Sequence, residues 1–214
     1  MFTEAELAAF RAAGRERTWA PGEVVIHQGD QSRYAVLVTH GLVKVTADAD
    51  TGYTSLLALR GPGELVGELA CIDGRGRSAT VSAMRVVHGI VVGEAEFRDL
   101  LVRDGGIALT VLRSVVGRLR DADVERVSHG AHPTGQRIAR ILLDLAMRHG
   151  SDVDDPKGGR TVTINQQELA GAAATSRESV VRTLRVLQRE GLVSARRGLT
   201  IVHDLRRLGG WSGL

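Results

Sequence analysis

Between residues 21 and 93, short apolar stretches alternate with turn residues, which is typical of a β-rich domain. The stretches recur roughly every ten residues, a spacing typical of a β-roll or barrel. Within one of them, apolar Val43 and Val45 alternate with polar Lys44 and Thr46, as in a half-buried strand. The predicted strands are EVVIHQ, YAVLVTHG, LVKVTAD, TSLLALRG, ATVSAM and VVHGIVVG.

Helical patterns lie on both sides of this region. Residues 3–14 predict a short helix with Thr3 as its cap, residues 94–102 a second one, and residues 104–129 a long one. A helix facing its own core is one interpretation of the long helix, but the narrowness of its apolar stripe favours a seam between two copies, and hence a homodimer. The stripe, at steps of four and three, consists of Ala108, Leu112, Val115, Leu119 and Ala122.

The last third of the chain predicts a second domain. GAHPTG (130–135) reads as a hinge, Pro133 stands near the start of a helix that runs to residue 149, and residues 150–159 read as a loop. Two more helices and a hairpin at 193–204 follow. The sequence therefore predicts an α+β protein: a β-roll domain at 1–103, a dimerisation helix and hinge at 104–131, and a second domain at 132–214.

Charge separates these regions. Residues 1–135 contain 15 Lys and Arg against 17 Asp and Glu, whereas residues 136–214 contain 13 against 8. A basic block is often only a solvated surface, so it indicates nucleic acid only together with a DNA-binding pattern. The single cysteine, Cys71, excludes an internal disulfide and a multi-cysteine metal site, and no apolar run reaches the roughly 20 residues of a membrane span. We expect a cytoplasmic protein without membrane attachment.

One segment of the β-rich region combines groups that suit a sugar phosphate. Residues 67–81 read GELACIDGRGRSATV: a turn glycine, the carboxylate Glu68, and the adjacent Arg77 and Ser78. A carboxylate accepts hydrogen bonds from sugar hydroxyls, and an arginine with a hydroxyl and backbone N–H groups holds a phosphate. A salt bridge between Glu68 and Arg77 that closes a loop is the alternative.

A second pattern, in residues 162–190, predicts two consecutive helices capped by Asn165 and Ser176. Val180, Leu184 and Leu187 would face the core, which leaves the arginines and Glu178 on the outer face. An ordinary helical hairpin is one interpretation of this pattern. In a major groove, Arg177 and Arg182 can donate paired hydrogen bonds to guanine, and Glu178 can accept from cytosine N4. Phosphate contacts are expected from Asn165, Gln167 and Ser176, and from Arg196 and Arg197 at the hairpin tip.

These two segments, with PGEVVIHQGDQSRYAVLVTHGLVKV at 21–45, resemble the family of the cyclic-AMP receptor and the fumarate–nitrate regulator over residues 18–204. The resemblance implies a cyclic-nucleotide-binding β-roll of jelly-roll type, a long dimerisation helix and a winged helix-turn-helix. It also implies that Glu68 binds the ribose, that Arg77 and Ser78 bind the cyclic phosphate, and that the backbone of Gly67, Leu69 and Ala79 lines the site.

The position that selects the base departs from the family. Where cyclic-AMP-responsive members carry a Thr-Ser pair, this chain has Ala122 and Asp123. The Asp123 carboxylate can accept a hydrogen bond from an amino group but adds negative charge near an anionic ligand. Cyclic AMP is the first expectation for an effector, with another cyclic nucleotide, or no effector at all, as alternatives.

The resemblance also implies partners: double-stranded DNA with two-fold symmetric, TGTGA-like half-sites, a second copy of the chain, and RNA polymerase. We expect no enzyme activity, no catalytic residues, no metal and no cofactor beyond the effector, because no nucleotide-binding P-loop, zinc motif or nucleophile elbow follows the β-roll. A nucleotide-regulated enzyme subunit and a regulator whose β-roll is only a scaffold are the alternatives. The turn before the second helix carries Ala174 where the family places glycine, so we expect a strained left-handed residue there.

Overall fold

The computed structural model describes residues 2–50, 52–153, 159–196 and 198–213, with the backbone alone for residues 125 and 128–130. The chain divides into two compact units. The first contains residues 1–48 and 57–122, and the second contains residues 49–56 and 123–214. The predicted α+β class is confirmed. None of the described helices is long and apolar enough to cross a membrane.

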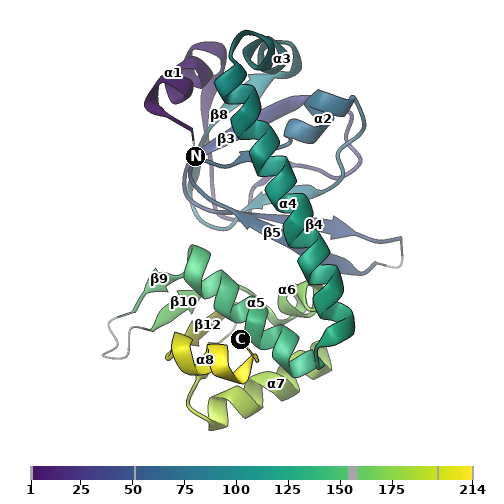
Figure 1. Cartoon of the computed structure of the whole chain (residues 1–214), viewed down its shortest axis with the longest axis vertical. Coiled ribbons are helices and arrows are strands. Elements are labelled where there is room, and N and C mark those ends of the chain that lie inside the picture. Colours follow the sequence, from purple (N-terminus) through teal and green to yellow (C-terminus); the bar gives the residue numbers. More distant parts are fainter. Residues whose placement is uncertain (1, 51, 154–158, 197, 214) are drawn as a thin grey trace. The chain divides into compact units, whose positions relative to one another are not determined.

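Two four-stranded sheets form the β-roll of the first unit, with strand orders β1-β8-β3-β6 and β2-β7-β4-β5 (Figure 1). Two of the strands, β1 and β6, were not predicted. The first is RERTW, whose mostly exposed side chains give no apolar alternation, and the second has only two residues. The strands are β1 (Arg15–Trp19), β2 (Val24–Ile26), β3 (Tyr34–His40), β4 (Val43–Asp48), β5 (Thr54–Arg60), β6 (Leu65–Val66), β7 (Thr80–Ala83) and β8 (Val87–Gly93).

Strand β3 is buried on both faces, because successive side chains of a strand point to opposite sides. Ala35 and Leu37 pack against the helices in one core cluster. Val36 and Val38 pack against the other sheet, beside Trp19, in a second cluster. This strand therefore joins the two cores of the unit, which explains why its sequence is apolar without alternation.

The helices of the first unit are α1 (Glu4–Ala13), α2 (Glu68–Asp73), α3 (Glu94–Arg103) and α4 (Gly105–Ala131). Thr3 caps α1 as predicted, in a capping box with Glu6. Helix α2 was not predicted, because it has six residues and lies between two glycines. On α4, Ile107 and Val111 are buried in the same core cluster as Phe10 and Phe97, so one face of α4 belongs to the β-roll.

The second unit contains a sheet of order β11-β12-β10-β9 and four helices besides the end of α4 (Figure 1). The predicted loop at 150–159 is wrong at its start, where Ser151 pairs with Thr161, and residues 154–158 lie outside the described part. The last helix was not predicted either. The elements are α5 (Thr134–His149), β9 (Ser151–Asp152), β10 (Arg160–Val162), α6 (Gln166–Ala172), α7 (Arg177–Arg189), β11 (Val193–Arg196), β12 (Leu199–Val202) and α8 (Leu205–Trp211).

The helix pair α6–α7 followed by the β11–β12 hairpin forms the predicted winged helix-turn-helix. The buried face of α7 is the predicted one, with Val180, Leu184 and Leu187 in the core. Gly191 follows the helix with a positive φ of 68°, as expected of a residue that ends a helix. The pairing of Arg196 with Leu199 is the last of the hairpin, next to Gly198.

Candidate functional site

Gly67 forms the sharp turn between β6 and α2. Its φ is 78°, in the left-handed region that favours glycine. A Cβ atom at this position would lie 2.6 Å from Cδ1 of Ile26, 2.8 Å from Nη1 of Arg77 and 2.9 Å from the carbonyl oxygen of Tyr34, so that side chains and backbone would have to shift. The turn therefore needs glycine both for its backbone angle and for the close approach of Arg77.

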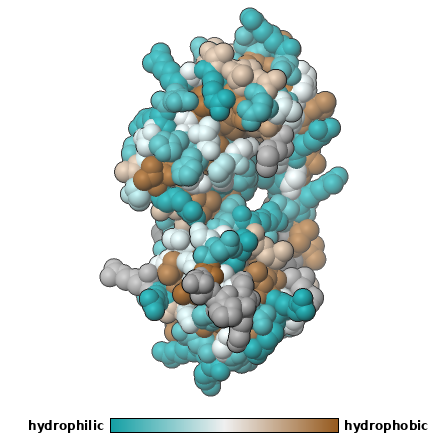
Figure 2. Space-filling model, turned by 90° about the vertical axis from the view of Figure 1, so that its left-hand side faces the viewer, coloured by the Kyte–Doolittle hydropathy of each residue, from teal (hydrophilic) through white to brown (hydrophobic). Residues whose placement is uncertain are grey.

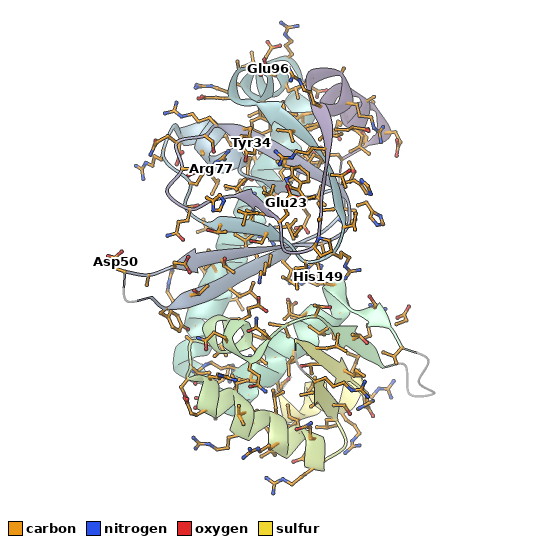
Figure 3. All side chains as sticks on the ribbon, turned by 180° about the vertical axis from the view of Figure 1, so that it is seen from behind. Glu23, Tyr34, Asp50, Arg77, Glu96 and His149 are labelled. Atoms are coloured by element: carbon orange, nitrogen blue, oxygen red, sulfur yellow. The ribbon has the colours of Figure 1, made fainter. Side chains whose placement is uncertain are left out.

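Arg77 is buried, with 4% of its surface exposed, and its guanidinium group is bonded to the main chain. Nη1 donates to the carbonyl oxygen of Gly67 at 2.7 Å, and Nη2 donates to that of Tyr34 at 2.8 Å. Its Nε lies 3.4 Å from Oγ of Ser32, and its guanidinium carbon, Cζ, lies 4.6 Å from the centre of the Tyr34 ring (Figure 3). Arg77 thus links β3 to the turn before α2.

Glu68, the first residue of α2, is 1% exposed and forms an ion pair with α4. Its Oε1 accepts a hydrogen bond from Nη2 of Arg118 at 2.6 Å. A buried carboxylate without a partner is costly, so Arg118 stabilises the charge of Glu68 and holds α4 beside the segment 67–81, called the cassette from here on. The alternative pairing of Glu68 with Arg77 is wrong: each of these residues has other partners.

Arg60 adds a third arginine to this neighbourhood. Burial lowers the pKa of Arg60, and the positive charge of Arg118 lowers it further. The carboxylates of Glu64, Glu68 and Asp121 act in the opposite direction, Glu64 most strongly. Glu64 lies 3.6 Å from Nε of Arg60. Arg60 and Arg118 therefore form a network of opposite charges with these carboxylates within the first unit.

The remaining predicted cassette residues are placed as follows. Ser78 is exposed, and Ala79 is buried just before β7 begins. Leu69 is largely exposed on α2. Asp123 lies in the second unit, where its carboxylate pairs with Arg126 at 2.9 Å, so its part in base selection stays a prediction.

Sequence reasoning missed Arg118, Tyr34 and Ser32. Arg118 is a charged residue on a helix whose pattern was interpreted only for its apolar stripe. A buried glutamate needs a positive partner, and that requirement was the one signal that pointed to it. Tyr34 and Ser32 contribute a carbonyl and a hydroxyl from a predicted strand and the turn before it, which no sequence pattern identifies.

In the second unit, the turn between α6 and α7 is built as predicted. Asn165 caps α6 in a capping box with Glu168, and Ser176 caps α7 by accepting from the backbone N–H of Ser179 at 3.2 Å. Ala174 has a φ of 45°, so the expected left-handed alanine is present. It is the one described residue other than glycine with a positive φ.

The outer face of α7 is charged and exposed. Arg177, Glu178 and Arg182 line a shallow surface hollow together with Val181 and Arg185. Figure 2 shows hydrophilic side chains at the end of the second unit where α7 lies. Because the opposite face is fully buried, the structure orients these five side chains toward solvent as one surface.

Glu178 is prepared to act as an acceptor. Hydrogen bonds from its own backbone N–H and from Ser176 lower the pKa of its carboxyl group, and the positive charge of Arg177 contributes in the same direction. The side chain is therefore ionised at neutral pH and presents oxygen atoms only, as a contact to a base amino group requires.

Four other predicted DNA-contact residues lie outside this helix in the sequence. Gln167 and Asn165 are exposed at the start of α6, although Oδ1 of Asn165 already accepts from the backbone N–H of Glu168 at 2.8 Å. Arg196 is exposed at the end of β11, and Arg197 lies outside the described residues.

No group of three or more potential metal ligands occurs among the described residues. Cys71 is fully buried, and burial raises the pKa of its thiol to about 11. It is therefore protonated at neutral pH and packs as a small apolar side chain.

Comparison with known proteins addresses both units. A model of the cyclic nucleotide-binding domain matches residues 16–104, and one of the Crp-like helix-turn-helix domain matches residues 136–210. A cyclic AMP receptor protein of Thermus thermophilus is 32% identical over 190 residues, which cover 89% of this chain and 84% of that protein. The chain belongs to the CRP/FNR family of transcription regulators.

Other members of the family show the same extent of similarity. The cAMP-activated global regulator Vfr of Pseudomonas aeruginosa is 27% identical, with 89% of this chain and 90% of Vfr covered. The c-di-GMP-responsive regulator CLP of Xanthomonas campestris has a TM-score of 0.81 at 25% identity, over 94% of this chain and 99% of CLP. As a CRP/FNR protein, the chain is a DNA-binding transcription regulator with a cyclic-nucleotide-binding domain.

Proposed function

We propose that this CRP/FNR protein acts in the cytoplasm as a homodimer that binds a two-fold symmetric DNA site with TGTGA-like half-sites, and that a cyclic nucleotide, cyclic AMP first, controls this binding. The observation that carries the DNA part is the outer face of α7, where Arg177, Glu178 and Arg182 are exposed together. Binding of such a dimer beside a promoter would recruit or block RNA polymerase.

The chemistry of α7 supports base reading. Each arginine offers a planar pair of donors that matches O6 and N7 of guanine, and ionised Glu178 accepts from cytosine N4. Ser176 and Gln167, near the N-termini of their helices, supply phosphate contacts. Arg196 and Arg197, on the hairpin, neutralise phosphates farther along the duplex.

An exposed apolar stripe on α4 supports the dimer. Leu112 and Leu119, both in the predicted seam, are 57% and 62% exposed, and Leu109 and Val116 add to the same face. Of the other predicted seam residues, Ala108 and Val115 are half-buried, so the exposed stripe lies partly one residue away from the predicted one. Apolar residues at steps of three and four with no cover in a monomer are typical of a two-helix interface.

The cassette residues Glu68 and Arg77 support a nucleotide effector. The way they are bonded also favours a second candidate function, that of a regulator without an effector. A nucleotide whose ribose binds Glu68 would share this carboxylate with Arg118, and a phosphate that binds Arg77 would share its guanidinium group with the carbonyls of Gly67 and Tyr34. Because the protein itself already bonds both groups, a regulator that needs no effector, with the β-roll as scaffold, is the alternative function.

The DNA and dimer proposals have one test each. Selection of bound sequences from a random pool should yield a symmetric motif with half-sites about one helical turn apart, roughly 10–10.5 bp. An asymmetric single site would contradict the proposal.

In sedimentation experiments, Leu112→Glu should convert dimers to monomers. Val102→Glu, at an exposed position of α3, is the matched control and should not.

Calorimetry separates the two candidates for control. The wild-type protein is titrated with cyclic AMP, cyclic GMP and c-di-GMP, and DNA affinity is measured with and without each. Saturable binding of one nucleotide that changes DNA affinity supports control by an effector. No heat from any of the three, with full DNA affinity, supports the scaffold function. Asp123→Ser should change the ranking of the nucleotides, and an unchanged ranking places Asp123 outside the base pocket.

A further inference from the structure

Val181 lies in the middle of the charged outer face of α7. Glu178, Val181, Arg182 and Arg185 are spaced at i, i+3, i+4 and i+7, which places them on one continuous face of the helix. With Arg177, the same residues line the surface hollow of the second unit. Val181 is thus the one apolar residue among the five that line it.

Core packing does not explain this valine. The positions that bury α7 are Val180, Leu184 and Leu187, whereas Val181 is only half-buried, one step around the helix from Val180. Valine is also a weaker helix former than alanine, because its branched Cβ restricts the side chain against the preceding turn. A β-branched apolar side chain surrounded by charged ones is useful where a partner presents an apolar group.

In the major groove of DNA, the apolar group that a partner can present belongs to one base only. The edges of the bases present hydrogen-bond donors and acceptors, and the one apolar group among them is the C5-methyl of thymine. We infer that Val181 contacts a thymine methyl group and so adds a thymine preference next to the guanines read by Arg177 and Arg182. This inference rests on the proposed role of α7 in reading DNA.

The arrangement of the five side chains is consistent with such a contact. Val181 follows Arg177 by four residues, one turn along the helix, and directly precedes Arg182. A methyl group met by Val181 therefore lies close to the base pairs that the two arginines contact. The proposed TGTGA-like half-site places thymines beside guanines, as this geometry requires.

Deoxyuridine provides the test, because it differs from thymidine by the methyl group alone. The symmetric site selected by the wild-type protein is prepared as duplexes in which each thymine of a half-site is replaced in turn, in both half-sites. Dissociation constants are then measured by fluorescence anisotropy. One replacement should weaken wild-type binding about fourfold per half-site, the effect of exposing one buried methyl-sized group.

The variants assign that effect to Val181. In Val181→Ala the cost of the sensitive replacement should disappear, while the dependence on guanines stays. Val181→Thr keeps the shape with one methyl fewer and should lose part of it. Val186→Ala, at another half-buried valine of α7, is the matched control and should keep the full cost.

Two results overturn the inference and leave the proposed function intact. One is a wild-type protein that selects a motif but is indifferent to every thymine methyl. The other is a cost that is equal in wild type and Val181→Ala. If the wild-type protein selects no motif, or one that does not depend on Arg177 and Arg182, then the proposed function itself fails, and the inference with it.

Discussion

Arg77 and Arg182 are the same residue type in opposite settings. The guanidinium group of Arg77 is buried and bonded to the carbonyls of Gly67 and Tyr34, whereas Arg182 is exposed on α7. The first arginine links β3 to the turn before α2, and a ligand would share it with these carbonyls. The second adds nothing to a core and is available to a partner. An arginine therefore suggests an anion site in both places. Burial decides whether its donors bond to carbonyls of the same chain, as in Arg77, or face solvent, as in Arg182.

The sharpest way to break this comparison is Arg77→Ala. The substitution leaves two carbonyl oxygens without their donors in a buried place, each worth about 1–3 kcal/mol, so we expect a loss of about 3 kcal/mol in the free energy of unfolding. Urea denaturation of the full chain measures it. Arg75→Ala, in the same loop but exposed, is the control and should change stability by less than about 0.5 kcal/mol. Equal effects of the two substitutions would show that Arg77 is not structural.

The reverse pattern is expected on α7. Arg177→Ala and Arg182→Ala should each remove about 1–3 kcal/mol of discrimination at one base pair, because a bidentate contact to guanine is lost, and leave stability unchanged. Sequence selection on each variant shows which position becomes degenerate. Arg189→Ala, in the last turn of α7, should leave the motif intact. A motif altered by Arg189→Ala alone would move the reading surface to the other end of the helix.

Ala174 tests whether backbone conformation, and not only side-chain burial, affects stability in the turn before α7. Ala174→Gly should stabilise the protein by about 0.5–1 kcal/mol, because glycine removes the left-handed strain but loses some conformational entropy. Thermal or urea unfolding measures the change. Ala172→Gly, at the end of α6, is the matched substitution at a helical residue and should destabilise instead. Stabilisation by both would mean that helix ends, rather than φ at Ala174, determine the effect.

The smallest effect is expected at the hairpin. Arg196→Ala should weaken binding to all DNA sequences alike and reduce the slope of log affinity against log salt by about 1, because one phosphate contact is lost. Affinities at several salt concentrations, on specific and random duplexes, test this. A changed base preference would instead make Arg196 a reader like Arg182.

Local periodicity and capping predicted the α+β class, the helix pair and the buried face of α7, and the family resemblance added the winged helix-turn-helix. Val180, Leu184 and Leu187 recur at helical spacing, and Ser176 is a strong cap. The elements that the sequence did not predict are short or polar: β6 has two residues, α2 six, and β1 carries charges. Pairing across the β-roll supplies what these segments lack on their own, and such long-range contacts leave no local pattern.

The candidate sites divide in the same way. The outward residues of α7 were identified because exposure on a helix follows directly from its buried face. The partners of the cassette were not, because Arg118 is 50 residues from Glu68, and Tyr34 is 43 from Arg77. The sequence showed that Glu68 and Arg77 belong to one segment, but not that each is bonded elsewhere.

The interlocking of Gly67 and Arg77 has a consequence for how such proteins evolve. A side chain at Gly67 would displace Arg77, and loss of Arg77 would leave the carbonyl of Gly67 unbonded, so we expect a change at either position to destabilise the fold. A lineage that stopped responding to nucleotides would still retain both residues, because folding alone selects for them. Proteins descended from such a lineage would keep the sequence pattern of the cassette without binding a nucleotide. In this family, nucleotide binding therefore has to be measured and not inferred from these two residues.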